Sequence, residues 1–314
     1  MIYVTGGFMK KILVILGITL ILVGLLFYYQ KDLQKLYYSI LRNFQNENVV
    51  LEEKNEYFRD YDFMFVQNTE DFTPHSRQDI LNIFYTAINS GVDNFTFYCP
   101  EEYGQCLDEV ERLANNQDLL SDINNFVHPY NGFNHIETQY DSLGKVSIQI
   151  KKSYSKKQIE EISQKVEELK EELILPTDTD LNNIRRVHDY IINHSVYDSD
   201  RSDYNVTTYQ SDIAYGPLIE GYGICGGYTD AMQLFLEEMG IKSYKIASDQ
   251  HVWNAVYLDN TWYHLDLTWD DPVTSTGENL LEHKFFFIDT PTLLSIEQTE
   301  HRFDQNIYAE LKEA

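Results

Sequence analysis

The stretch that decides the fold is residues 221–240, GYGICGGYTDAMQLFLEEMG, in which glycines surround a single cysteine, Cys225. From Tyr228 to Met239 apolar side chains recur at helical spacing, and Gly240 is a typical residue just past a helix end. Cys225 is therefore predicted to lie at or just before a helix N-terminus. Free backbone N–H groups and the positive end of the helix dipole stabilise a thiolate at such a position.

A structural cysteine is the competing interpretation of Cys225. Buried structural cysteines usually lie in the middle of an apolar face among bulky neighbours, whereas Cys225 is closely flanked by glycines. Glycines also let a substrate backbone approach closely. We therefore expect a reactive thiol at Cys225, with Tyr222 and Gly226 as substrate contacts.

A thiol nucleophile needs a base, and the base needs a group that orients it. Residues 251–258 and 261–269, HVWNAVYL and TWYHLDLTW, are rich in strand-forming residues and flank an Asp-Asn dipeptide at 259–260. A two-residue hairpin turn at this dipeptide puts His251 and Asp266 on one face as diagonal neighbours. A three-residue turn would put them on opposite faces.

Both residues have plainer interpretations when taken alone. A His in a strand is more often a satisfied core residue than a base, and an Asp in an apolar strand needs a partner because a buried unpaired carboxylate is costly. Together with Cys225 they predict a triad of nucleophile, base and orienting carboxylate. His264 is expected to support the structure. The tryptophans are expected to pack and exclude water, with a direct substrate contact left open for Trp253.

Three segments resemble the bacterial transglutaminase-like superfamily and occur in the family's order: IRRVHDYIINHSVYD at 184–198, GYGICGGYTDAMQLFLEEMGI at 221–241 and HVWNAVYLDNTWYHLDLTWDDP at 251–272. The family has a Cys at a helix start, a His in an H-x-W-N setting and an Asp in a W-x-x-x-D-x-T-W-D setting. These match Cys225, His251 and Asp266. The resemblance covers about residues 182–289, and Val252 stands where Ala is usual.

The resemblance implies an α+β fold with a papain-like transglutaminase core, in which the helix that carries the Cys packs on an antiparallel sheet. It also implies that Cys225 attacks a carboxamide carbonyl, that His251 transfers the proton, and that Asp266 holds the imidazole. The acyl-enzyme then passes to water, as in a peptidase or amidase, or to an amine, as in a transglutaminase. No residue decides between the two, and the abundance of water slightly favours hydrolysis.

The resemblance leaves one donor of the oxyanion hole without an assignment. The Cys225 backbone N–H is the first donor. Papain-like enzymes often have a Gln six residues before the Cys, and Ile219 stands there in this chain. Tyr222 and Tyr215 are the remaining candidates.

Four regions are expected along the chain: a membrane anchor at 1–30, a juxtamembrane linker at 31–60, an accessory α/β region at 61–175, and the transglutaminase-like domain at 176–314. In the accessory region, residue patterns predict helices at 77–89, 103–115 and 156–172, a strand at 92–98, and a hairpin of 133–140 with 145–151. Residues 198–212 are expected to form a solvated acidic loop, since they lack the Gly and the final Glu of a calcium loop.

Residues 12–29 form an unbroken apolar run of 18 residues that follows two lysines. As a helix it would be about 27 Å long, close to the ~30 Å of a bilayer core. A cleaved signal peptide is the alternative, but the run is long for one and no small-residue cleavage site follows. We expect a single-pass anchor in the cell membrane, with residues 30–314 outside the cytoplasm.

The composition excludes several classes of function. A formal net charge of −26 makes nucleic acid an unsuitable partner, because phosphate binding needs a basic surface. The sequence shows no metal-ligand cluster, phosphate-binding loop or dinucleotide fingerprint, so we expect no metal, no cofactor, and a protein or peptide as the substrate. Cys99 and Cys106 lack the C-x-x-C spacing of disulfide-handling enzymes, and their pairing stays open. The alternative function is an inert transglutaminase-like module that binds another protein.

Overall fold

The computed structural model describes residues 5–30, 33, 37, 40, 49–51, 53–273 and 280–313. The chain divides into two compact units, Met1–Val49 and Val50–Ala314. The first unit contains helix α1, Thr5–Tyr28. The structure describes few positions between 31 and 48 of the predicted juxtamembrane linker, and the rest of this linker, from Val50 to residue 60, belongs to the second unit.

The predicted membrane-spanning helix is not supported. None of the helices in the described part of the chain combines the length and the apolar character that crossing a membrane requires. The sequence-based expectation for residues 12–29 therefore remains without structural evidence.

An antiparallel sheet forms one layer of the second unit. Its strand order is β6-β7-β8-β9, with β6 at Ser243–Ala247, β7 at Val252–Leu258, β8 at Thr261–Leu265 and β9 at Phe286–Ile288. All neighbouring strands are antiparallel. The antiparallel sheet implied by the family resemblance is therefore confirmed.

The turn between β7 and β8 sets the register of these two strands. Asp259 and Asn260 both adopt left-handed backbone angles, with φ of 51° and 64°, as a two-residue turn of the kind favoured in hairpins requires. Leu258 consequently pairs with Thr261, and the pairing continues to the end of β8 at Leu265. The predicted two-residue hairpin is confirmed.

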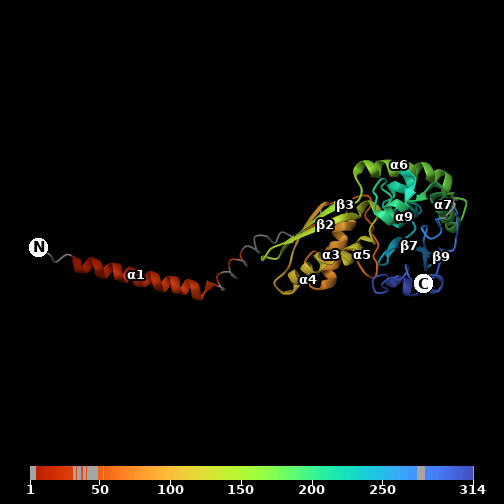
Figure 1. The fold of residues 1–314 in the computed structure, drawn as a ribbon. Helices are drawn as coiled ribbons and strands as arrows, with labels where there is room; N and C mark the ends of the chain where they lie inside the picture. The colour runs from red at the N-terminus through yellow and green to blue at the C-terminus, as the bar shows by residue number, and fades with distance from the viewer. Residues whose placement is uncertain are drawn as a thin grey trace. The chain divides into compact units, whose positions relative to one another are not determined.

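Helix α9, Cys225–Glu238, lies between the sheet and two further helices (Figure 1). It packs on β6 and β7 with one face and on α6, Lys156–Leu173, and α7, Asp180–His194, with the other. Every residue from Gly227 to Leu236 is buried. This burial on all sides explains why apolar residues occur on every side of α9, with Thr229, Asp230 and Gln233 as buried polar residues among them.

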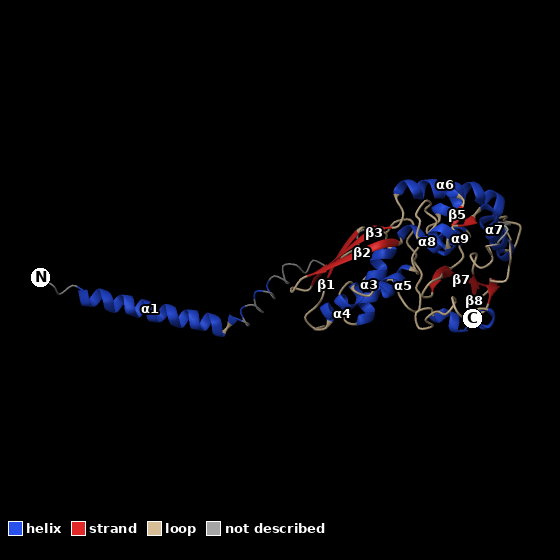
Figure 2. Ribbon diagram, viewed as in Figure 1, coloured by secondary structure: helices blue, strands red, loops and turns tan. Residues whose placement is uncertain are grey.

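A second sheet, of order β1-β3-β2, lies in the accessory part of the unit (Figure 2). Its strands are β1 at Asn94–Tyr98, β2 at Phe133–Tyr140 and β3 at Lys145–Lys152. The accompanying helices are α3 at Arg77–Asn89, α4 at Cys106–Ala114 and α5 at Gln117–Asn124, of which the sequence analysis missed α5.

The remaining elements are short. They are the 3-10 segments Pro129–Asn131 and Ala309–Glu313, the strands β4 at Val196–Tyr197 and β5 at Tyr222–Gly223, the helices α8 at Ser199–Tyr204 and α10 at Thr290–Ile296, and the π-helical segment Gly216–Glu220. The segment predicted as a solvated loop thus begins with α8. Asp198 caps this helix by accepting a hydrogen bond from the backbone N–H of Arg201.

The core continues across the predicted boundary at residue 175. Ile162, Val166 and Leu169 of α6 are buried in the same cluster as residues of α7 and α9. The predicted accessory region and the predicted catalytic domain lie in one compact unit, Val50–Ala314. Helix α6 is therefore part of the layer that covers α9.

Candidate active site

Cys225 is the first residue of α9 and is not part of a disulfide. Its side chain is half-buried. Ile224, which precedes it, is extended, and no side chain caps the helix. The first backbone N–H groups of α9 are therefore not used by a capping side chain, and the positive end of the helix favours an anion at the position of the thiol.

The glycines after Cys225 make room for the chain's own backbone. A Cβ added at Gly226 would lie 2.6 Å from the carbonyl oxygen of Asp212, and one at Gly227 would lie 2.3 Å from that of Ser211. The backbone N–H of Ile224 donates to the same Ser211 carbonyl at 2.9 Å. Gly226 is expected as a substrate contact, but its close approach to this neighbouring segment explains why a glycine stands there. The same segment holds the start of α9 in place.

His251 and Asp266 meet as the hairpin register predicted. His251 Nε2 lies 2.6 Å from Asp266 Oδ2, and both side chains are almost completely buried. Burial lowers the pKa of His251, but the charge and hydrogen bond of Asp266, and then those of Cys225, raise it to about 10. The Cys225 sulfur therefore lies within reach of the imidazole, and because Nε2 faces Asp266, Nδ1 is left for the thiol.

Asp266 is held by four donors. Its Oδ1 accepts from the backbone N–H groups of Thr268 at 2.9 Å and Trp269 at 3.2 Å. Its Oδ2 faces Nε2 of His251 and also Nε2 of His301, the latter at 2.8 Å. Although burial raises the pKa of Asp266, the two imidazoles lower it well below its usual range. The group is therefore a fixed anion.

Thr229 links the helix that carries Cys225 to the strand that follows His251. Its Oγ1 is within hydrogen-bond distance of the carbonyl oxygens of Cys225, at 2.7 Å, and Val252, at 3.0 Å. Asn254 of β7 donates in turn to the carbonyl of Thr229 at 3.1 Å. These contacts fix the distance between the thiol and the imidazole.

His264 and Trp253 belong to the support of the site. The indole N–H of Trp253 donates to Nδ1 of His264 at 2.9 Å, and Nε2 of His264 faces Thr290 Oγ1 at 2.9 Å. Burial, and next the charge of His301, lower the pKa of His264 to about 3. Trp253 is fully buried and stacks on His251. The proposed substrate contact of Trp253 is therefore corrected to a packing role.

The two candidates for the second oxyanion donor have partners elsewhere. Tyr215 donates to Glu161 Oε2 at 2.8 Å. The ring of Tyr222 stacks on Tyr209, with the centroids 3.8 Å apart. Tyr197 is a further side chain close to Cys225. Burial raises the pKa of Tyr197, its hydrogen bond with Ser202 lowers it, and the charge of Cys225 raises it.

Within the described residues, two groups of side chains have the spacing of a metal site. His251, Asp266 and His301 form one, and their hydrogen bonds already join these groups to one another. His188, Asp189 and His283 form the other, in which both imidazoles face Asp189 Oδ1 at 2.8 and 2.7 Å. Hydrogen bonds of normal length account for both groups.

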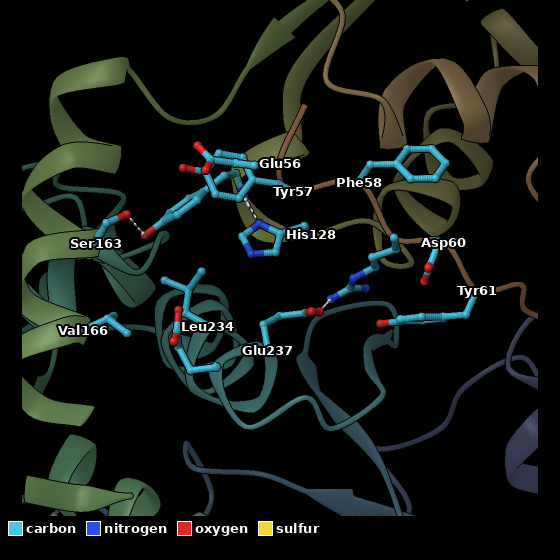
Figure 3. Close-up of a pocket in the computed structure, with 13 residues that line it drawn as sticks. Glu56, Tyr57, Phe58, Asp60, Tyr61, His128, Ser163, Val166, Leu234 and Glu237 are labelled. Atoms are coloured by element: carbon cyan, nitrogen blue, oxygen red, sulfur yellow. Dashed lines mark hydrogen bonds and ion pairs between the residues drawn. The ribbon is translucent and has the colours of Figure 1, made fainter. Parts of the chain in front are cut away.

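A cavity of about 450 Å³ lies at the other end of α9, away from Cys225 (Figure 3). It is lined by Leu234 and Glu237 from the last turns of the helix and by residues 56–61 of the accessory part. Because α9 has 14 residues, its two ends are about 20 Å apart. The cavity is therefore distinct from the site around Cys225.

Comparisons with known proteins agree with this core. Residues 167–267 match the family model described as "Transglutaminase-like superfamily", and this range contains Cys225, His251 and Asp266. No curated protein matches the chain.

Similar solved structures include the following two. One, a TGase, is 12% identical over 56% of this chain, with a TM-score of 0.35. The other, a proposed cysteine protease from Cytophaga hutchinsonii, is 13% identical over 47% of this chain, with a TM-score of 0.28. The matches span 49% and 65% of these two proteins, less than two thirds of each. On the family match, residues 167–267 have the fold of the transglutaminase-like superfamily.

Proposed function

We propose that the chain is a thiol enzyme that acts on amide bonds of proteins or peptides through Cys225, His251 and Asp266. The observation that carries the proposal is the position of His251, whose imidazole interacts with the Asp266 carboxylate at 2.6 Å and with the Cys225 side chain. A nucleophile, a base and an orienting carboxylate in contact in this order are the components of a catalytic triad.

In the proposed reaction the Cys225 thiolate attacks the carbonyl carbon of the amide and forms a tetrahedral intermediate. The His251 imidazolium then gives its proton to the leaving nitrogen as the C–N bond breaks. A thioester on Cys225 and a free amine or ammonia result. Water or an amine attacks the thioester, His251 takes up the proton of the attacking group, and the Cys225 thiolate is released.

The side chains around Cys225 leave the acceptor undecided. The thiol is half-buried, so solvent reaches it, and water is present at far higher concentration than any amine. This favours hydrolysis over transglutamination. Tyr222 stays a candidate for substrate contact because it is partly exposed and lies three positions before Cys225.

The reaction is tested by incubating the full chain with glutamine-containing peptides, with and without a primary amine, and reading the products by mass. Backbone cleavage identifies a peptidase, loss of ammonia alone an amidase, and loss of ammonia with gain of the amine a transglutaminase. The Cys225→Ala variant must lose whichever activity is found. Activity that survives in this variant would contradict the proposal.

An inert binding module is the second candidate, and the cavity at the far end of α9 favours it, since a partner could bind there without using Cys225. Alkylation by iodoacetamide separates the two. In an enzyme of the proposed kind, iodoacetamide reacts with Cys225 at pH values well below about 8.5, the ordinary pKa of a thiol. Reaction of Cys225 with the pH dependence of an ordinary thiol would favour the binding module.

We further propose that residues 30–314 work outside the cytoplasm, attached to the cell membrane through residues 12–29. The disulfide between Cys99 and Cys106 supports the location, because such bonds persist mainly in oxidising compartments. Labelling of intact cells with a membrane-impermeant reagent, followed by alkaline extraction of the membranes, tests both statements. A chain that stays unlabelled contradicts the location outside the cytoplasm. A chain that leaves the membrane on extraction contradicts the attachment through residues 12–29.

A further inference from the structure

We propose that His301 and Glu297 extend the triad, with His301 acting as a positioning residue that holds Asp266 and limits how strongly it attracts the proton of His251. This inference rests on the proposed function. Both residues lie after the range that matches the family model, which ends at residue 267. They belong to the segment that follows α10 and returns to the site.

The contact is direct and completely buried. His301 Nε2 lies 2.8 Å from the same Asp266 oxygen that His251 uses, and the His301 side chain has no exposed surface. Asp266 Oδ2 is thus shared by two imidazoles, while its Oδ1 accepts two backbone N–H groups. Loss of His301 would leave Asp266 with one fewer donor in a site that water does not reach.

The second ring nitrogen of His301 also faces a carboxylate. Its Nδ1 lies 2.9 Å from Glu297 Oε2. The Glu297 carboxylate accepts the backbone N–H groups of Thr299 at 2.6 Å, Glu300 at 2.9 Å and His301 at 3.1 Å. Burial raises the pKa of Glu297, but the hydrogen bonds of His301 and of these backbone groups lower it to about 2. Glu297 is therefore an anion.

The hydrogen bonds determine the charge of His301. An ionised carboxylate can only accept, so each ring nitrogen of His301 must carry a hydrogen when it faces one. The ring is then an imidazolium between Asp266 and Glu297. The side chains along the line from His251 to Glu297 accordingly alternate in sign: imidazolium, carboxylate, imidazolium, carboxylate.

Aromatic side chains hold the His301 ring in this orientation. Phe285 stacks on it, with centroids 5.2 Å apart and planes at 10°, and the rings of Trp253 and Trp269 pack against it at 4.8 and 5.2 Å. A ring enclosed in this way cannot turn away from Asp266 without opening the core. This rigidity is what a positioning residue requires.

The charge of His301 has a predictable effect on His251. The titratable groups that interact with His301 are Asp266 and Glu297 through hydrogen bonds, His251 through an edge-on contact at 5.2 Å, and His264 through its charge. A cation shared by Asp266 weakens the hold of this carboxylate on the His251 proton. His251 can then release the proton to the leaving nitrogen more easily.

The experiment measures the rate of Cys225 carboxamidomethylation in the full chain from about pH 4 to pH 11. The variants are His301→Gln, which removes the positive charge, and Glu297→Gln, which removes the anion that holds it. Glu300→Gln is the matched control, because this exposed neighbour loses the same charge without a side-chain contact to His301. Thermal unfolding of every variant confirms that it folds.

For His301→Gln we expect both inflections of the pH profile, that of the Cys225 thiol and that of the His251 imidazolium, to move to higher pH. The upper one should move by about one pH unit, because removal of a cation makes each deprotonation harder. Glu300→Gln should match the wild type. A purely structural role would loosen the thiolate–imidazolium pair, so that the two inflections approach each other. That outcome, or a profile identical to the wild type, overturns the inference. An ordinary thiol profile in the wild type itself would contradict the proposed function instead.

Discussion

His251 and Asp266 lie in contact, with Nε2 and Oδ2 2.6 Å apart, although neither is directly opposite the other in the β7–β8 hairpin. His251 precedes β7 and Asp266 follows β8, so both stand at the same open end of the hairpin. The two-residue turn at the other end gives them the same face.

Replacing Asp266 by Asn should lower the rate of acyl transfer by about 10²- to 10⁴-fold, because the amide cannot stabilise the imidazolium or fix its tautomer in the same way. The peptide assay read by mass measures the loss. Asp249→Asn is the matched control, since Asp249 is an exposed carboxylate two residues before His251. A rate within a few-fold of the wild type for Asp266→Asn would remove this carboxylate from the mechanism.

Stability should fall as the pH rises through the alkaline range. The pKa of His251 is raised from 6.5 to about 10, because Asp266 and Cys225 outweigh the effect of burial. A raised pKa means that the folded state binds the proton more tightly, so this stabilisation is complete below about pH 6.5 and is lost as the pH approaches 10.

Urea unfolding of the wild type and of His251→Gln at several pH values measures this contribution as a difference. The gap between the two free energies of unfolding should narrow steadily above neutral pH. A gap that stays constant across this range would show that His251 is not protonated more readily in the folded protein.

Replacing Thr229 by Val should reduce the rate of Cys225 alkylation by roughly tenfold, on the scale of the 1.4 kcal/mol that a hydrogen bond of this kind contributes. The hydroxyl that joins the carbonyls of Cys225 and Val252 is lost, while the shape of the side chain is kept. Thr229→Ser restores the hydroxyl and should restore the rate. Equal rates for the Val and Ser variants would contradict the positioning role of Thr229.

Replacing Gly227 by Ala should destabilise the protein by about 1–3 kcal/mol. The new methyl group would lie 2.3 Å from the Ser211 carbonyl oxygen, which is backbone and cannot move away easily. Gly104→Ala is the control, because a Cβ at Gly104 meets nothing within 4 Å. Chemical unfolding compares the two variants, and similar free energies would show that the 211–213 segment does not pack tightly on α9.

Removal of the disulfide by the double change Cys99→Ser and Cys106→Ser should cost roughly 2 kcal/mol of stability, since the bond closes a short loop with a sequence separation of 7. The alkylation profile of Cys225 should not change. Thermal unfolding with and without a reductant provides the measurement, and a wild type that is insensitive to the reductant would show that the bond does not form.

The core around α9 could be predicted from the sequence because its signals are local. The glycines before the apolar helix, the Asp-Asn turn and the alternation in β7 and β8 each act within a few neighbouring residues. The positions of Cys225, His251 and Asp266 follow from these signals. The helix over residues 77–89 was also predictable, since Ser76 caps it and Gly91 stands just beyond its end with a positive φ.

The supporting residues could not be predicted, because their roles depend on contacts between distant segments. His301 reaches Asp266 from 35 residues away, and nothing in the local pattern TEHRFD indicates a buried ring. The sequence predicts a substrate contact at Gly226, because it does not show that the 211–213 backbone occupies the space beside Gly226 and Gly227. Trp253 was left open as a substrate contact because strand alternation does not reveal complete burial.

The late position of His301 also has a consequence for biosynthesis. The segment after α10 supplies His301 to Asp266, and Tyr308 and Leu311 from the same segment are buried in the core. A nascent polypeptide that has emerged from the ribosome only as far as the hairpin already contains Cys225, His251 and Asp266, yet it lacks the second partner of the carboxylate. The cysteine would thus gain its full reactivity only after the segment that carries His301 has also been synthesised and has packed against Asp266.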